Sequence, residues 1–142
     1  YRGLVLDIGG RDRGAFIKPR AQVERWIFAD IVPEHHPDVV LDVCHMDSVA
    51  SGSVDVVNAI ELFEHVADIE RGLDECVRVL RPGGHLVLSV PFLWPVHADP
   101  CDYQRWTDTR WNMALVRRGL IVEECEVLGR FFSVLADMAR VF

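Results

Sequence analysis

The sequence predicts an α/β fold in which a doubly wound, mostly parallel sheet carries helices on both faces. Short, nearly all-apolar runs alternate with segments of helical periodicity along the 142 residues, and such runs are typical of strands buried on both faces of a parallel sheet. The first three runs carry an acid at or near their ends, in Leu4–Ile8, Trp26–Asp30 and Val39–Asp42. Right-handed crossovers would bring these carboxyl ends to one edge of the sheet, where ligands bind in such folds.

Turn and capping signals define the remaining elements. The later strands are expected at Val54–Ile60, His85–Val90 and Leu120–Leu128. Asp68–Leu80 is predicted as a helix because its apolar residues fall on one face and Asp68 can cap its N-terminus. The proline and glycines of "RPGG" are expected to stop this helix before a tight reversal. Other helices are expected over Ala15–Arg25, Thr107–Arg118 and Phe131–Phe142.

Composition indicates one globular domain over residues 1–142, half of them hydrophobic. No apolar run approaches the length of about 20 residues that a membrane span needs. The net charge of −7 argues against a nucleic-acid partner. Four widely spaced cysteines without a C-x-x-C pair give no zinc signature and favour a reducing, cytoplasmic setting. The apolar end of the chain would need a cover, which leaves a homo-oligomer open.

The stretch "LVLDIGGRDRG", residues 4–14, predicts a strand that runs into a ligand-binding loop. A phosphate loop is excluded because Ala15 and Phe16 stand where lysine and a hydroxyl residue would be needed. A dinucleotide loop fits better, although Arg11 replaces its middle glycine, and Asp30 lies near the expected offset of about 20 residues. However, Asp7 directly before the loop would repel a pyrophosphate and suits a cationic ligand.

S-adenosylmethionine is a ligand of that kind, since it carries a sulfonium and an ammonium group and no phosphate. Three acids at strand ends would each have a role in holding it. Asp7 would face the cationic methionine part, Asp30 would accept from the ribose hydroxyls, and Asp42 would accept from the adenine amino group.

Five stretches carry a resemblance to a known family: "LVLDIGGRDRG", the acid of "FADI", "VDVVNAIELFEHV", "ECVRVLRPGGHLVLSVP" and "HADPCDYQRWT". In this order they resemble class I S-adenosylmethionine-dependent methyltransferases, and most of all the small bacterial methyltransferase-type-11 enzymes. The resemblance implies a Rossmann-like core and methyl transfer to oxygen or nitrogen of a small-molecule acceptor. By position, the expected cofactor-binding residues are Asp7, Gly9, Gly10, Asp30, Asp42 and Glu61.

The chain departs from the family pattern in two ways. Arg11 stands where the loop usually has a glycine, and the sequence lacks the N-terminal lid helix and the seventh strand. These departures favour one alternative, a catalytically silent domain that keeps the fold for binding or assembly. A nicotinamide-dependent oxidoreductase is a second alternative, which Asp7 and Asp42 disfavour.

The loop after the fifth strand contains the candidate catalytic residues His97, Asp99 and Tyr103. An amine or hydroxyl acceptor can require removal of a proton, and histidine is the side chain best suited to that step near neutral pH. The alternative interpretation is a loop that is held by its own hydrogen bonds and stiffened by prolines.

The segment "ELFEH" contains the carboxylates of Glu61 and Glu64 and the imidazole of His65, a set that can hold a divalent ion. This segment is similar to the E-x-x-E-H segment of metal-dependent O-methyltransferases that act on quinone precursors and small-RNA ends. In those enzymes a further histidine follows the fifth strand, and His97 and Asp102 stand in that loop here. The expectation is nevertheless no metal, because Glu-His at this place is widespread in the broader family without one, and Glu64 can simply cap the next helix.

Overall fold

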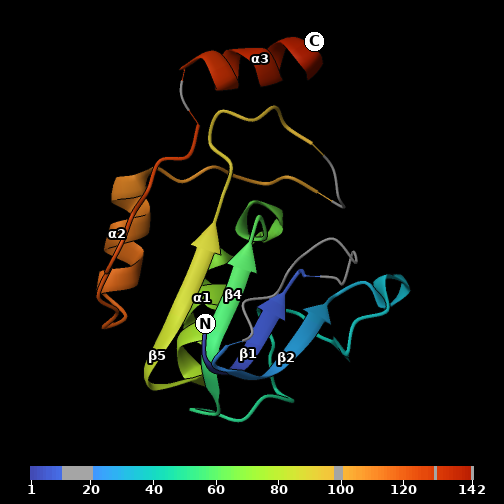
Figure 1. The fold of residues 1–142 in the computed structure, drawn as a ribbon, viewed down its shortest axis with the longest axis vertical. Coiled ribbons are helices and arrows are strands. Elements are labelled where there is room, and N and C mark those ends of the chain that lie inside the picture. The colour runs from blue at the N-terminus through green and yellow to red at the C-terminus, as the bar shows by residue number, and fades with distance from the viewer. Residues whose placement is uncertain (11–20, 98–100, 130, 142) are drawn as a thin grey trace.

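The computed structural model describes residues 1–10, 21–97, 101–129 and 131–141. A five-stranded sheet has the order β3-β2-β1-β4-β5. Its strands are β1 (Gly3–Ile8), β2 (Val23–Asp30), β3 (Val39–Val40), β4 (Val54–Ile60) and β5 (Leu80–Ser89). All four pairings between neighbours are parallel. The predicted parallel sheet, with the strand order of a Rossmann-like fold, is therefore confirmed (Figure 1).

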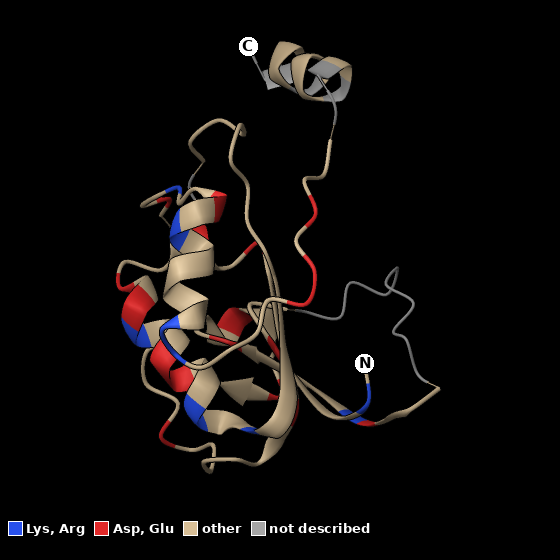
Figure 2. Cartoon of the chain, turned by 90° about the vertical axis from the view of Figure 1, so that its left-hand side faces the viewer, with Lys and Arg blue, Asp and Glu red and all other residues tan. Residues whose placement is uncertain are grey.

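Two helices cover one face of this sheet. α1 (Ile69–Val79) and α2 (Asp108–Val116) lie side by side on it, whereas α3 (Phe131–Val141) lies apart from both (Figures 1 and 2). The predicted caps are confirmed, since the side chains of Asp68 and Thr107 accept the N–H groups of Arg71 and Arg110. None of the described helices is long and apolar enough to cross a membrane.

The core lies between the sheet and these two helices. Leu6, Val57 and Ala59 from the strands pack with Leu73 and Cys76 of α1. Trp111 of α2 joins the same cluster through an edge-on contact with Phe63, with ring centroids 5.6 Å apart. On the surface, acids of α1 pair with arginines of α2 and the turn that follows it (Figure 2): Glu70 with Arg110, Arg117 and Arg118, and Asp74 with Arg118.

Two short 3-10 helices follow strands at the carboxyl edge of the sheet. η1 (Pro33–His35) comes after β2, and η2 (Phe63–His65) comes after β4. η1 is followed by β3, and η2 is followed by α1.

Three element boundaries differ from the prediction. The helix expected over Ala15–Arg25 falls mainly outside the described residues, and its last three positions belong to β2 instead. The third strand ends at Val40, because Asp42 turns back to form an isolated bridge with His45. The fifth strand begins directly at Leu80, and Arg81–Gly84 form a bulge, since Leu80 pairs with Val54 and His85 with Val56.

The strand predicted at Leu120–Leu128 is wrong. These residues are not in a strand, and Ile121 and Val127 are 86% and 89% exposed. Their apolar, β-branched composition favours an extended chain, but a strand also needs a partner and a face to bury. The segment instead runs away from the end of α2 toward α3 (Figure 2).

The burial of α1 gives a direct test of the core. Leu73 is fully buried, so Leu73→Ala should lower the free energy of unfolding by about 2–5 kcal/mol through lost contacts and a cavity. Met113→Ala is the control, because Met113 is 60% exposed on α2 and should change stability by at most about 0.5 kcal/mol. Urea titration measures both, and equal effects would contradict this packing.

Candidate functional site

Parallel pairing brings the ends of the strands to one edge of the sheet. Asp7 of β1 is in register with Phe28 of β2 and Asn58 of β4, and Ile60 is in register with Ser89 at the end of β5. Asp30 is the last residue of β2. The loop after β5 arches over this edge (Figure 1). The candidate cofactor residues that are described therefore lie along one edge, as the acid-ended strands predicted.

Asp7 is buried at this edge and is held from both neighbouring strands. Its Oδ2 accepts a hydrogen bond from Trp26 Nε1 at 2.9 Å, and its Oδ1 accepts one from Asn58 Nδ2 at 2.7 Å. Gly10 lies against the same carboxylate, because a Cβ at that position would be 2.4 Å from Asp7 Cγ. Asp7 and Gly10 thus have a packing role that needs no ligand.

Gly9 makes the turn out of β1. Its φ of +74° lies in the left-handed region, and its N–H donates to Ala29 O at 2.8 Å. The predicted loop residue Arg11 lies outside the described residues, so the start of this loop is described only at Gly9 and Gly10.

Asp30 already has two partners within the chain. Its Oδ1 accepts from the Val32 N–H at 2.8 Å, and its Oδ2 is 2.8 Å from His35 Nδ1 of η1. Each carboxylate oxygen has a second lone pair. Asp30 can therefore accept hydrogen bonds from hydroxyl groups while it keeps these contacts. A ligand bound to Asp30 would lie next to His35.

Asp42 follows β3 and Glu61 follows β4, on opposite sides of β1 in the sheet order. Asp42 Oδ1 accepts from the Cys44 N–H at 2.8 Å, which closes the turn after β3. Glu61 has a φ of +51°, an uncommon conformation for a residue with a side chain, and its Oε1 accepts from Ser89 Oγ at 2.6 Å. Strain of this kind is often found at functional sites.

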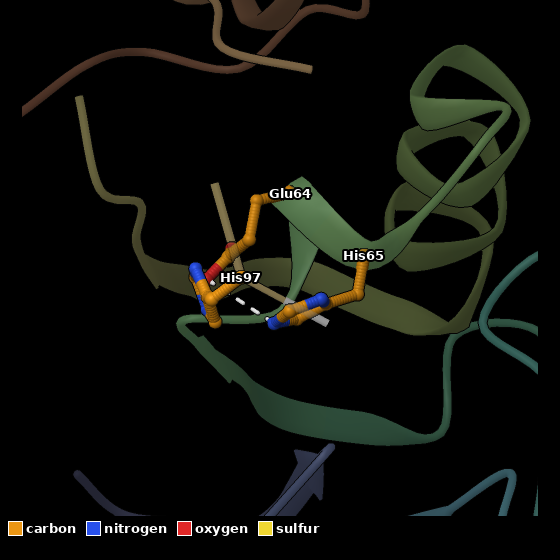
Figure 3. A group of neighbouring side chains, drawn as sticks. All are labelled: Glu64, His65 and His97. Carbon is orange, nitrogen blue, oxygen red and sulfur yellow. Dashed lines mark ion pairs between the residues drawn. The ribbon is translucent and has the colours of Figure 1, made fainter. Parts of the chain in front are cut away.

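Three side chains converge beside this edge. Glu64 and His65 come from η2 and His97 comes from the loop after β5, and one ligand atom of each lies within 4.8 Å of the others (Figure 3). Glu64 Oε1 and His65 Nε2 are 3.6 Å apart. The imidazole rings of His65 and His97 pack edge to face, with their centroids 5.1 Å apart. Of the set predicted as a metal alternative, Glu61 is replaced by His97, because Glu61 instead binds Ser89.

The rings of both histidines are oriented by acceptors at their Nδ1 atoms. His65 Nδ1 is 2.7 Å from Cys101 O, and His97 Nδ1 is 3.2 Å from both Pro95 O and an oxygen of Asp102. A carbonyl oxygen only accepts, so these contacts favour a proton on each Nδ1 and a lone pair on each Nε2.

Glu64 is the buried acid of this cluster. Its residue is 1% exposed, and neither carboxylate oxygen has a hydrogen-bond partner among the described residues. Desolvation raises the pKa of Glu64 above its usual range. The cluster therefore contains a carboxylate whose ionised form is destabilised by burial and two imidazole lone pairs. Such a set would accept a proton or hold a cation.

The remaining predicted catalytic residues differ in their placement. The Tyr103 side chain is exposed, and its backbone N–H, rather than its hydroxyl, contacts the cluster by donating to Glu64 O at 2.8 Å. A hydrogen bond with Cys101 raises the pKa of Tyr103. Asp99 lies outside the described residues. Sequence reasoning missed the backbone carbonyls of Pro95 and Cys101, because no residue type marks them.

The buried acid makes a stability prediction with a defined sign. Because the pKa of Glu64 is raised in the folded protein, its ionisation costs stability as the pH rises above the usual value for glutamate. Glu64→Gln removes this cost, and its amide can donate to an imidazole. We expect the variant, in chelator, to be about 1–3 kcal/mol more stable than the wild type at pH 7.5, with a smaller difference at pH 4.

Urea titration at the two pH values measures this difference. Glu124→Gln is the control, because Glu124 is exposed and its substitution should change stability little at either pH. A Glu64→Gln variant that is less stable than the wild type at pH 7.5 would contradict the assignment of Glu64 as an uncompensated buried carboxylate.

Comparison with known sequences agrees with this geometry. Residues 20–88 match the family model of a methyltransferase domain. A ubiquinone biosynthesis O-methyltransferase from Cupriavidus pinatubonensis is 50% identical over 38 residues, which are 27% of this chain but only 15% of that protein. The chain thus covers a small part of that curated relative.

Solved structures share the fold. A SAM-dependent methyltransferase from Archaeoglobus fulgidus superposes with a TM-score of 0.68 at 20% identity, over 99% of this chain and 77% of that one. The methyltransferase in a complex with the Haloferax volcanii Trm112 methyltransferase activator superposes with a TM-score of 0.66 at 23% identity. The match covers 82% of this chain and 60% of that one. Residues 20–88 thus resemble a methyltransferase domain in sequence, and the chain as a whole has the fold of class I S-adenosylmethionine-dependent methyltransferases.

Proposed function

We propose that this chain binds S-adenosylmethionine along the carboxyl edge of its sheet and transfers the methyl group to oxygen or nitrogen of a small-molecule acceptor. The observation that carries this proposal is the cluster of Glu64, His65 and His97 beside that edge, in which the His97 Nδ1 contacts leave Nε2 to accept a proton. Substrate-binding loops in such folds follow the strands at this edge.

The edge suits a cofactor of positive charge. Asp30 and Asp42 keep lone pairs for a ribose and an adenine amino group, and Glu61 lies between β4 and β5 at the same edge. Asp7 would face the methionine part across Gly10, and Gly9 makes the turn at the end of β1. When bound, the cofactor supplies a methyl group on a positively charged sulfur.

The chain's own part in the reaction is to orient the acceptor and take its proton. The His97 side chain is 37% exposed, so an acceptor can reach the ring from solvent. The proton of an acceptor hydroxyl or amine would pass to this nitrogen as the acceptor attacks the methyl group in line. Nearby Glu64 would stabilise the imidazolium that forms.

A second candidate is a divalent ion held by Glu64, His65 and His97. The observation that favours it is the buried Glu64 carboxylate without a hydrogen-bond partner, which faces two imidazoles. Carboxylate and imidazole ligands fit such an ion, and it would supply a positive charge that acidifies a hydroxyl group. The similarity to a ubiquinone biosynthesis O-methyltransferase agrees with an oxygen acceptor.

The cofactor proposal predicts a specific binding pattern. Calorimetric titration should give binding of S-adenosylmethionine in the micromolar range and none of NAD, and Asp30→Ala should weaken it tenfold or more, corresponding to about 1.4 kcal/mol. Glu34→Ala is the control, because Glu34 is exposed on the same 3-10 helix as His35.

Two results would redirect the interpretation. Tighter binding of NAD would contradict the cofactor assignment. S-adenosylmethionine binding without turnover of any acceptor would instead support the silent binding or assembly domain, an alternative that is consistent with the related fold in a complex with a methyltransferase activator.

If His97 takes the proton of the acceptor, its replacement should lower turnover. His97→Gln should lower kcat about 10²- to 10⁴-fold without a change in cofactor affinity, because it removes the proton acceptor. Release of S-adenosylhomocysteine with a panel of catechols and primary amines measures this. His85→Gln is the control, since His85 lies on β5 with a 42% exposed side chain. Equal activity of His97→Gln and wild type would contradict the role of His97.

The same assay distinguishes the two candidates. If the cluster acts through a divalent ion, chelator should lower the turnover of the wild type, and the added metal should restore it. If His97 acts as a base without an ion, chelator should have no effect.

A further inference from the structure

We infer that Asp102 is a positioning residue, which holds the His97 ring beside Glu64 and His65 with its proton on Nδ1 and a lone pair on Nε2. In its kinetic part this inference rests on the proposed function. In its structural part it concerns which nitrogen of His97 carries the proton, and that can be measured without any substrate.

Asp102 lies directly against His97. The Asp102 side chain is 2% exposed, and its Oδ2 accepts from the His97 backbone N–H at 3.1 Å and lies 3.2 Å from Nδ1. One carboxylate oxygen therefore contacts both the backbone and the ring of the same residue. This double contact fixes the ring relative to the chain, as the supporting carboxylate of a functional histidine does.

Asp102 is itself held in place by Arg105. The guanidinium binds both carboxylate oxygens, with Nη2 2.6 Å from Oδ2, and the Arg105 side chain is 18% exposed. A carboxylate in such a two-point ion pair has a fixed orientation, so its Oδ2 meets Nδ1 as an acceptor.

Glu64 and His65 of η2 lie beside the His97 ring, and Asp102, which Arg105 binds, lies 3.2 Å from its Nδ1. His65 is held in the same manner, with Nδ1 at 2.7 Å from Cys101 O and Nε2 at 3.6 Å from Glu64 Oε1. Residues of the loop after β5 thus contact Nδ1 of both rings, which leaves a lone pair on each Nε2.

A purely structural role of Asp102 is the competing explanation. Asp102 and Arg105 are three residues apart, so their pair could simply close the turn before α2. Pro95 O also lies 3.2 Å from His97 Nδ1 and could hold the ring without help. The two explanations differ in what happens to the His97 tautomer when the carboxylate is removed.

Long-range proton–nitrogen NMR of the whole chain, at a pH where His97 is neutral, reads the tautomer directly. The wild type should show the Nδ1–H form of His97, and Asp102→Asn should convert it to a mixture or to the Nε2–H form. Asp74→Asn is the matched control, because Asp74 makes an exposed ion pair with Arg118 at 2.7 Å, away from the cluster. It should leave the tautomer unchanged.

Kinetics supplies the second readout. Asp102→Asn should lower kcat about 10- to 100-fold and leave the affinity for S-adenosylmethionine within about twofold, whereas Asp74→Asn should change neither. An Nε2–H tautomer in the wild type would overturn the inference, as would an unchanged tautomer in a folded Asp102→Asn variant. A wild type that methylates no acceptor would count against the proposed function, while the tautomer would still decide the role of Asp102.

Discussion

The Asp7 carboxylate joins the three central strands of the sheet. It accepts one hydrogen bond from Trp26 of β2 and one from Asn58 of β4, while Gly10 packs directly against it. A buried carboxylate is costly without such partners, so these contacts fix the register of β1 and the path of the chain that leaves it. The edge along which Asp30, Asp42 and Glu61 lie follows from this parallel arrangement.

The cluster of Glu64, His65 and His97 also contains a buried carboxylate, but this one lacks hydrogen-bond donors within the described part of the chain. Glu64 is as buried as Asp7, yet no described residue donates a hydrogen bond to its carboxylate. A folded protein tolerates an uncompensated group of this kind where function requires it, at the expense of stability. The two histidines are held from outside by Cys101 O and Asp102, so the surroundings orient the cluster but leave its inner atoms available to a proton, a cation or an acceptor.

Much of this arrangement can be predicted from the sequence, because local signals agree with the fold. Val54–Ile60 forms the predicted strand exactly, and Asp68 and Thr107 cap helices where expected. The strand expected at Leu120–Leu128 fails because apolar composition does not specify a partner. Adjacent parallel strands explain why His97 can meet Glu64, but the carbonyl partners of the two rings depend on a backbone path that no side chain encodes.

Amide-resolved NMR of the labelled chain during titration with S-adenosylhomocysteine tests the central claim most directly. We expect the largest shifts at Gly9, Gly10, Asp30, Asp42 and Glu61, and smaller shifts at Glu64, His65 and His97, because these residues share the carboxyl edge of the sheet. Shifts that centre on the exposed segment from Leu120 to Leu128, or no shifts in a folded chain, would contradict it.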